Sequence, residues 1–330
     1  MRSSLISAPV TMPHRPFFGA CVAQRCQEAR APVGHMRVVG RGRQPRCGSW
    51  PLHGRLCSLA NGGLMGKART HRAAWAGAVM AGAALVASAA PPAAAVVGGD
   101  RAEIKKYPWT VALTSQDVKE PECAGTLVAP RKVLTASHCV SAATVDGVRV
   151  VGGREDLRDT RKGTVRKVTK LWIHPKADTE GHGATYAHDL AVLTLNAPMP
   201  YRTLPLATPA QQKLYEEGAP NRVLGWGSTT GRDDDTRVPP LQTALIPNRG
   251  DEQCITAYGT LRYRSAYTMC IGYPAGGVSA CSGDSGGPVV VRGRLVGVIS
   301  GGGSCTSRLY PGVAVKSASY YSLLQSQIAG

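Results

Sequence analysis

From Val96 onward, short apolar runs alternate with turn residues, and this rhythm limits the folds that the chain can adopt. Runs such as "WTVALTS" and "VRKVTKLWIH" lie before a proline-rich connection, "NAPMPYRTLPLATP", and runs such as "TMCIGYP" and "GPVVVRGRLVGVISGG" lie after it. Short apolar runs bounded by glycine, proline or polar turn residues are typical of β-strands. The sequence therefore predicts an all-β domain in two halves of similar length, and both barrels and sandwiches remain open at this point.

The end of the chain departs from this rhythm. In "SASYYSLLQSQIAG", Tyr320, Leu324 and Ile328 recur at intervals of four residues. This spacing places them on one face of a helix, so we expect a short amphipathic helix at about 317–328. The 39 glycines, 23 prolines and few aromatic residues of the whole chain agree with many strands and turns and few helices.

Residues 65–95 have the three parts of a secretory signal peptide. Lys67, Arg69 and Arg72 form a positively charged start, and an uncharged apolar stretch follows at 73–87. Small-residue cleavage sites, "ASA" and "AAA", come next. The apolar stretch is short and rich in alanine for a membrane span, so we expect a secreted, extracellular protein without a stable membrane anchor.

Residues 1–64 precede this signal, although a signal normally begins at or near the N-terminus. They are rich in Arg, Pro and Gly, contain four cysteines at spacings that fit no metal site, and show no periodicity. We interpret them as an upstream extension outside the native protein, with a genuine disordered extension as the alternative. The functional domain is then 96–330, released by cleavage directly before Val96 or after Ala89, which would leave a short pro-segment.

The net charge of +18 does not indicate a nucleic-acid-binding protein. Residues 1–95 contain 12 Lys and Arg and one acidic residue, so 27 basic and 20 acidic residues remain in 96–330. The surplus of 7 positive charges in that domain is not gathered into a basic stripe with aromatic residues, and it serves solubility. We expect a monomer that binds no nucleic acid.

Three segments carry residue types that together suit nucleophilic catalysis. Ser285 lies in "GDSGG", where the glycines let the backbone turn tightly and direct N–H groups to one point. His138 lies in "LTASHCV" at the end of a predicted strand, and Asp189 opens the apolar strand "DLAVLTL". A serine hydroxyl needs a base, a group that orients the base, and donors for the oxyanion that forms. The three segments offer all of these.

Each of these residues also has a structural interpretation. A histidine after a strand is often a packing or solvated residue, an aspartate that opens a strand is often a turn residue, and "GDSGG" alone could be a glycine turn. Their joint occurrence in one β chain with a signal peptide favours catalysis, although spacing does not show that the three side chains meet.

With these motifs, residues 96–330 resemble a chymotrypsin-like serine protease of the trypsin fold over their whole length. The matching segments are "VVGG", "LTASHC", "HDLAVLTL", "GWG", "GDSGGP" and "PGVAV". The resemblance implies two antiparallel β-barrels, at about 96–205 and 206–315, before the C-terminal helix. It also implies a serine endopeptidase in which His138 is the general base, Asp189 orients it and Ser285 is the nucleophile.

The resemblance assigns further roles. The N–H groups of Gly283 and Ser285 would form the oxyanion hole, and the α-ammonium of a mature N-terminus at Val96 would pair with Asp284. Six cysteines behind a secretory signal indicate disulfides, whose pairing the sequence leaves open. The resemblance selects three pairs: Cys123–Cys139, Cys254–Cys270 and Cys281–Cys305.

Ser279 stands six residues before Ser285, where the family has the floor of the pocket for the side chain that precedes the cut bond. A carboxylate there selects Lys and Arg, whereas a serine leaves the floor uncharged. By the same match, the pocket is completed by Ser300, Gly302 and Gly312. The sequence therefore predicts a chymotrypsin-like preference for Phe, Tyr or Leu, with trypsin-like or small-residue specificity as the alternative.

The chain also departs from the family. Gly301 stands where a tryptophan usually lines the cleft, so substrate alignment could be looser, and Ser137 stands where alanine is more common. The loop "GGREDLRDTRKG" only faintly resembles a calcium loop because arginines separate its acids, so we expect no metal and no cofactor. The rival functions are a binding-only homologue and an esterase. All three candidate catalytic residues are present, which argues against the first, and a peptide substrate would exclude the second.

Overall fold

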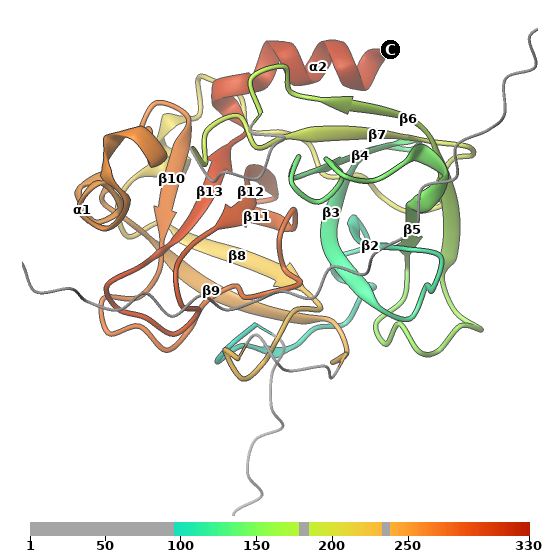
Figure 1. The fold of residues 1–330 in the computed structure, drawn as a ribbon, viewed down its shortest axis with the longest axis horizontal. Helices are drawn as coiled ribbons and strands as arrows, with labels where there is room; N and C mark the ends of the chain where they lie inside the picture. The colour runs from blue at the N-terminus through green and yellow to red at the C-terminus, as the bar shows by residue number, and fades with distance from the viewer. Residues whose placement is uncertain (1–95, 178–184, 233–237) are drawn as a thin grey trace, which may run out of the picture. The chain divides into compact units, whose positions relative to one another are not determined.

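The computed structural model describes residues 96–177, 185–232 and 238–330. The sequence interpretations for 1–64 and for the signal peptide at 65–95 lie outside these residues. In the described part, the elements form two antiparallel β-barrels side by side, with a helix at the C-terminal end (Figure 1). The predicted all-β class with two barrels and a short C-terminal helix is confirmed.

The first barrel is a closed sheet of six strands in the order β2-β3-β4-β7-β6-β5. Every neighbouring pair is antiparallel, and each strand forms backbone hydrogen bonds with two neighbours. The sheet therefore has no open edge. Its strands are β2 (Thr110–Thr114), β3 (Pro121–Ala129), β4 (Lys132–Thr135), β5 (Arg149–Gly152), β6 (Thr164–Ile173) and β7 (Ala191–Leu195).

The second barrel has six strands in the order β9-β10-β13-β12-β11-β8, and the pairing of β8 with β9 closes it. The short β1 (Asp100–Arg101) adds to β9, so the start of the domain belongs to the second barrel although the resemblance placed it with the first. The other strands are β8 (Pro220–Gly225), β9 (Gln242–Arg249), β10 (Thr268–Ile271), β11 (Pro288–Val291), β12 (Arg294–Gly301) and β13 (Gly312–Lys316).

Two α-helices and three 3-10 turns complete the described residues. The turns are η1 (Val145–Gly147), η2 (Gln212–Tyr215) and η3 (Ala318–Tyr320). The helix α1 (Asp251–Arg262) was not predicted from the sequence. It buries only Cys254 of its own residues and is interrupted at Gly259, where φ is +73°, so it carries no continuous apolar stripe that periodicity could reveal.

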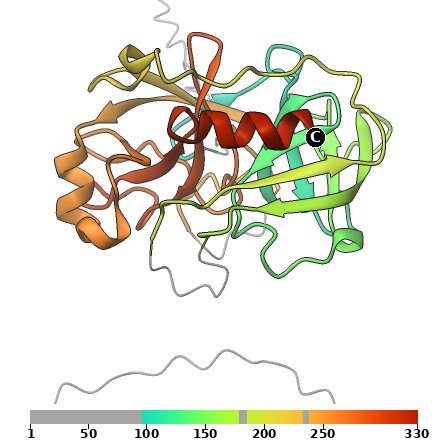
Figure 2. The ribbon, with the colours of Figure 1, turned by 90° about the horizontal axis from the view of Figure 1, so that it is seen from above.

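The predicted C-terminal helix is present as η3 followed by α2 (Tyr321–Ala329). It crosses from the second barrel toward the first along one side of both (Figures 1 and 2). Tyr320 and Leu324 are buried in the core cluster that also holds the first barrel's Leu193, and Ile328 packs at its margin. The intervals of four residues therefore do mark the face that packs.

Three disulfides lie among the described residues, and they are the pairs that the resemblance implies. Cys123 on β3 is joined to Cys139, Cys254 on α1 to Cys270 on β10, and Cys281 to Cys305. The first ties the segment after β4 to a strand of the same barrel. The third ties together the two loops on either side of β11 and β12.

Leu324→Ala should lower the free energy of unfolding by about 2–5 kcal/mol, the range for removing a fully buried leucine side chain and leaving a cavity. Ser322→Ala, on the exposed side of the same helix, is the control and should change it by less than about 0.5 kcal/mol. Urea unfolding of both variants checks this. Equal, small effects would mean that α2 is not anchored through Leu324.

Candidate active site

The first barrel brings His138 and Asp189 together. Strands β4 and β7 are neighbours, and Thr135 lies opposite Ala191 in their register. His138 comes three residues after Thr135 and Asp189 two residues before Ala191, so both lie at the same end of this strand pair. The His138 Nδ1 lies 2.8 Å from Asp189 Oδ2, and the His138 backbone N–H donates to Asp189 Oδ1 at 3.0 Å.

Two hydroxyl groups complete the environment of Asp189, which is only 8% exposed. Ser137 Oγ donates to Oδ1 and Ser300 Oγ donates to Oδ2, both at 2.6 Å. The unusual Ser137 therefore has a partner that the sequence did not predict. Ser300 differs from expectation, because its side chain turns to Asp189 and is not among the residues that line the cavity beside Ser285.

These contacts set the charges of the pair. Desolvation acts to lower the pKa of His138, but the hydrogen bond and charge of Asp189 outweigh it and raise that pKa above its ordinary value. Burial acts to raise the pKa of Asp189, yet hydrogen bonds from His138, Ser137 and Ser300 hold it below its ordinary value. Asp189 is thus ionised at neutral pH. With the Nδ1 proton directed to it, the neutral imidazole keeps Nε2 free to accept a proton.

The second barrel delivers Ser285 to the same place. Ser285 lies in the turn before β11, and its carbonyl accepts a hydrogen bond of 2.8 Å from the N–H of Ala124 on β3. The next residue, Gly286, has a φ of +77°, and a Cβ there would lie 2.1 Å from Thr135 Oγ1 at the end of β4. The turn is therefore packed directly against the strand that leads to His138. Within the described residues, no hydrogen bond joins the Ser285 hydroxyl to the His138 ring, and such bonds often form only with substrate bound.

The same turn holds two backbone donors that have no acceptor among the described residues. In the described part of the chain, the N–H groups of Asp284 and Gly286 donate to backbone carbonyls, whereas those of Gly283 and Ser285 do not. Gly283 has a φ of +95°, and a Cβ there would lie 2.8 Å from the Cα of Gly227. Only glycine fits this conformation and close approach.

Asp284 is completely buried and lies behind the turn. Its two oxygens accept hydrogen bonds of 2.9 Å from the N–H groups of Gly227 and Cys281. Burial nevertheless raises its pKa to about 7, since these two donors offset only part of the desolvation. The motif "GWG" makes room for this carboxylate, because a Cβ at Gly225 would lie 2.0 Å from Asp284 Oδ1 and one at Gly227 would lie 2.7 Å from its Cγ.

The beginning of the domain lies beside the turn that contains Asp284. Val96 is fully buried in the core of the second barrel. Val97 forms an isolated antiparallel bridge with Ser279, whose N–H donates to the Val97 carbonyl at 3.2 Å. The structure therefore places Val96 near the segment 279–284, and the described residues contain no cation bonded to Asp284.

A cavity of about 510 Å³ opens next to Ser285. Ser279, Gly302 and Gly312 line it, as predicted for the substrate pocket, and the Ser279 hydroxyl donates to the Ala280 carbonyl at 2.9 Å. None of its described lining residues carries a charge. The lining residues not yet named are Gly231, Ala280, Cys281, Ser282, Ile299, Gly301, Gly303, Ser304, Cys305 and Tyr310. The cavity thus suits an uncharged side chain.

Tyrosines that the sequence did not single out support the cavity walls. The Tyr258 hydroxyl donates to the Pro311 carbonyl at 2.6 Å and accepts from the Gly303 N–H at 2.8 Å, so it joins two wall segments. A Cβ at Gly301 would lie 2.7 Å from Tyr186 Cε1. Tyr186 therefore fills the space of the missing side chain at position 301. No sequence pattern signals these contacts, because each joins segments distant along the chain.

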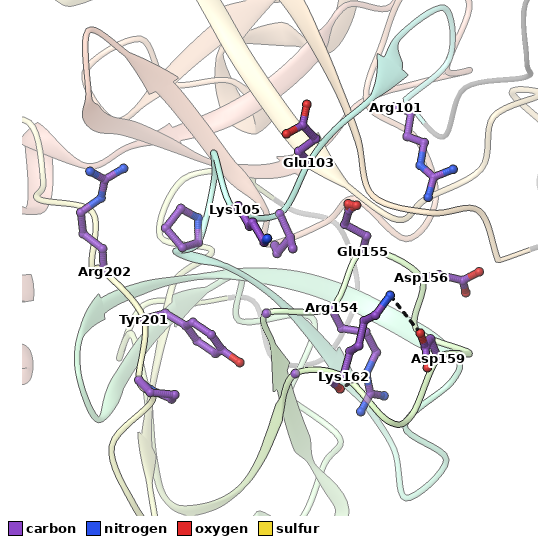
Figure 3. A pocket seen from close by; sticks show the side chains of 15 residues that line it. Arg101, Glu103, Lys105, Arg154, Glu155, Asp156, Asp159, Lys162, Tyr201 and Arg202 are labelled. Carbon is purple, nitrogen blue, oxygen red and sulfur yellow. Dashed lines mark hydrogen bonds and ion pairs between the residues drawn. The ribbon is translucent and has the colours of Figure 1, made fainter.

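A larger cavity, about 820 Å³, lies elsewhere and is not the candidate site. Figure 3 shows acidic and basic side chains around it, with Lys162 paired to Asp159 at 3.2 Å. It contains none of the candidate catalytic residues. At its edge the buried Arg154 donates to the carbonyls of Leu157 and Lys162. Both carbonyls belong to the loop "GGREDLRDTRKG", which faintly resembles a calcium loop.

One group of potential metal-binding side chains occurs in the described residues: Cys123, His138 and Cys139. The two cysteines are bonded to each other, so neither offers the thiolate that a metal would need. Among the described helices, none has the length and apolar character needed to cross a membrane.

Comparisons with known proteins agree on one family. The family model described as Trypsin matches residues 96–324. The chain is 40% identical over 233 residues to a trypsin of Saccharopolyspora erythraea, covering 71% of this chain and 98% of that protein. It is 30% identical over 251 residues to trypsin zeta of Drosophila melanogaster, covering 72% and 88%. It is 31% identical over 226 residues to trypsin 5G1 of Aedes aegypti, covering 68% and 81%.

Asp284 makes stability depend on pH while the Ala95–Val96 bond is intact. Its folded-state pKa of about 7 lies above the ordinary value of 3.8, so the folded chain holds the proton more tightly than the unfolded chain. The free energy of unfolding should therefore fall as pH rises from about 4 to about 7, by up to about 4 kcal/mol. Asp284→Asn, which does not titrate, should lose this dependence. Urea unfolding of both chains across this pH range checks it, and parallel curves would contradict it.

Proposed function

Because the chain belongs to the trypsin family of serine endopeptidases, we propose that it hydrolyses peptide bonds through Ser285, His138 and Asp189. The single observation that carries this assignment is the hydrogen bond of 2.8 Å between His138 Nδ1 and the buried Asp189, beside the turn that holds Ser285. Asp189 orients the imidazole and stabilises its protonated form, so Nε2 can take the proton of the Ser285 hydroxyl.

The reaction would proceed in two halves. Ser285 Oγ attacks the carbonyl carbon of the substrate, and His138 passes the proton to the leaving amine, which leaves an acyl-enzyme. Water then attacks the ester with His138 again as the base. The N–H groups of Gly283 and Ser285, which have no acceptor in the described protein, are suited to bind the oxyanion in both halves.

Asp284 would gain its counter-ion by cleavage before Val96. Its carboxylate is completely buried and accepts two N–H groups from the described residues, and the buried Val96 precedes Val97, which is bridged to Ser279. A free α-ammonium at Val96 would neutralise the carboxylate and hold in place the turn that contains the Gly283 and Ser285 N–H groups. An unpaired buried charge is strongly destabilising, so this pair would link maturation to activity.

The cavity supports a preference for Phe, Tyr or Leu before the cut bond. Its floor residue is Ser279, its walls at Gly302 and Gly312 add no side chains, and its described lining is uncharged. Burial of an aromatic side chain there would contribute up to about 4–5 kcal/mol. A Lys ammonium would lose its hydration against a hydroxyl alone, which is unfavourable. The name of the relatives, trypsin, makes cleavage after Lys or Arg the competing specificity.

We further infer that the protein is secreted. The support is the signal-like sequence of 65–95 together with three disulfides in the described domain, since such bonds persist in oxidising compartments. N-terminal sequencing of protein from the culture medium tests this and the cleavage site together. A mature chain that begins at Val96 is the expected result.

Ser285→Ala should fold and be secreted like the parent chain but lose peptide hydrolysis by roughly 1,000-fold or more, because the nucleophile is absent. The measurement is kcat/KM on a peptide anilide, together with labelling by an organophosphonate. Ser115→Ala, at an exposed serine directly after β2, is the matched control and should keep full activity. Near-parental hydrolysis by the Ser285 variant would falsify the assignment.

Substrates that differ only in the residue before the cut bond should rank Phe, Tyr and Leu first. Lys and Arg should be poorer by about 100-fold or more in kcat/KM, since the ammonium or guanidinium meets no carboxylate on the described cavity lining. The assay is a tetrapeptide anilide series. If Arg or Lys ranks first, or if Ala exceeds Phe, the role given to Ser279 is wrong even where Ser285 remains the nucleophile.

A further inference from the structure

His188, the residue directly before Asp189, has a left-handed backbone conformation with a φ of +69°. Among the described residues only one other non-glycine residue, Arg292, has a positive φ. Arg292 lies with Gly293 in the two-residue turn between β11 and β12, a type of turn that requires such angles. His188 lies in the connection between β6 and β7, where no hairpin turn requires it. A side chain disfavours this conformation, so it persists only where the surrounding structure holds it.

One hydroxyl group holds His188 at two points. The Tyr320 hydroxyl, in η3, accepts the His188 backbone N–H at 3.2 Å and lies 2.7 Å from Nδ1 of the His188 ring. Burial raises the pKa of Tyr320, so the hydroxyl keeps its proton. Because the hydroxyl accepts the backbone N–H, its own proton is free to be donated to Nδ1. The two bonds therefore fix both the backbone and the ring of His188.

The surroundings of the His188 ring keep it neutral and in place. The ring stacks on that of His174, with centroids 4.8 Å apart, and its centroid lies 5.1 Å from that of Tyr267. The described charged groups that act on it are Lys176 and Arg264, both positive, and with burial they lower the pKa of His188. Burial also lowers the pKa of His174, to about 4. Both rings are thus neutral at neutral pH, and Nδ1 of His188 can accept the hydroxyl proton.

Asp189 lies between two neighbours whose backbones are fixed. The Leu190 N–H donates to the His188 carbonyl at 2.8 Å, which closes a three-residue turn with Asp189 at its centre. The Leu190 carbonyl in turn accepts the N–H of His174 at 3.0 Å. In so tight a turn, a backbone rotation at His188 would redirect the Asp189 side chain. That side chain places Oδ2 at 2.8 Å from His138 Nδ1.

We propose that His188 and Tyr320 are positioning residues for the hydrolytic reaction. The Tyr320 hydroxyl holds His188 in its left-handed conformation and thereby sets the direction of the Asp189 carboxylate. That direction decides how well Asp189 orients the His138 imidazole. The inference rests on the proposed function, because the direction of Asp189 matters only if His138 is the catalytic base. Neither positioning residue lines the cavity at the candidate site, so both act through Asp189.

This arrangement gives the C-terminal helix a part in the active site. Tyr320 lies directly before α2, and Leu324 of α2 is fully buried in the same core cluster as Tyr320. The packing of the helix therefore sets the place of the hydroxyl. Since a misplacement of about 1 Å caused far from the chemistry can cost on the order of 100-fold in rate, loss of this link should lower the rate.

The central variant is Tyr320→Phe, which removes the hydroxyl and keeps the ring in the core. It should lower kcat by roughly tenfold, a part of the loss that a 1 Å displacement causes, and leave KM within about twofold, because the cavity lining is unchanged. Tyr321→Phe is the matched control: the Tyr321 hydroxyl forms no hydrogen bond within the described residues, and this variant should match the parent. Active sites are counted by complete labelling with an organophosphonate, so unfolded protein does not lower the measured kcat.

The pH profile separates positioning from a loss of stability. Asp189 raises the pKa of His138, so a misdirected carboxylate should raise it less. The acid limb of the kcat/KM profile should therefore move to lower pH in Tyr320→Phe and stay in place in Tyr321→Phe. A hydroxyl that merely stabilised the fold would change the amount of active protein and leave the limb where it is.

Two variants test position 188 directly. His188→Gly fits the left-handed conformation but lacks the ring, and it should lose kcat as Tyr320→Phe does. His188→Asn should keep kcat within roughly threefold of the parent, because asparagine tolerates this conformation and its amide oxygen can accept the hydroxyl proton. Equal kcat values for these two variants would overturn the role of the ring.

The parent chain distinguishes failure of this inference from failure of the proposed function. If the parent hydrolyses the peptide anilide and Tyr320→Phe matches Tyr321→Phe in kcat and in the acid limb, the positioning role is overturned and the proposed function stands. A parent chain that does not hydrolyse the peptide overturns both.

Discussion

The hydrogen bond from the Ala124 N–H to the Ser285 carbonyl joins the two barrels at the point where the site is assembled. Both barrels are closed, so neither offers a free strand edge with which the other could extend its sheet. The glycine at 286 lets the turn approach Thr135 closely enough for this bond. A serine from one barrel and a histidine and aspartate from the other therefore lie together without either sheet being interrupted.

The site holds two buried carboxylates, Asp189 and Asp284, and their surroundings shift their pKa values in opposite directions. Asp189 receives three side-chain partners, which keep its pKa below the ordinary value, so its charge is stable as folded. Asp284 accepts hydrogen bonds from two backbone N–H groups of the described domain, and burial raises its pKa to about 7. The hydrogen bonds of the first carboxylate keep it ionised, whereas the second has no cation bonded to it among the described residues. The orientation of His138 thus depends on Asp189, whereas the conformation of the turn at 281–285 depends on Asp284.

The sequence was sufficient to predict features that depend on residues close together in the chain. Strand rhythm predicted two β halves, the four-residue spacing of Tyr320 and Leu324 predicted α2, and the glycine turn drew attention to Ser285. It was insufficient where a contact joins distant segments, as for the hydroxyl of Ser137 on Asp189, or where a helix fully buries only one residue, as α1 does with Cys254. The family resemblance predicted Ser300 as a pocket residue, but it could not tell that the Ser300 hydroxyl donates to Asp189.

The cavity walls show why specificity in this fold cannot be assigned from lining residues alone. Gly302 and Gly312 leave the pocket open because they have no side chains, and the same lack makes their backbone less restricted. The wall is therefore positioned from outside: Tyr258 binds both Gly303 and Pro311 through one hydroxyl, and that hydroxyl is not part of the lining. An open, uncharged pocket is selective only while its backbone is held. If this cavity binds the side chain before the cut bond, as proposed, the residues that decide selectivity include those that hold the wall as well as those that touch the substrate.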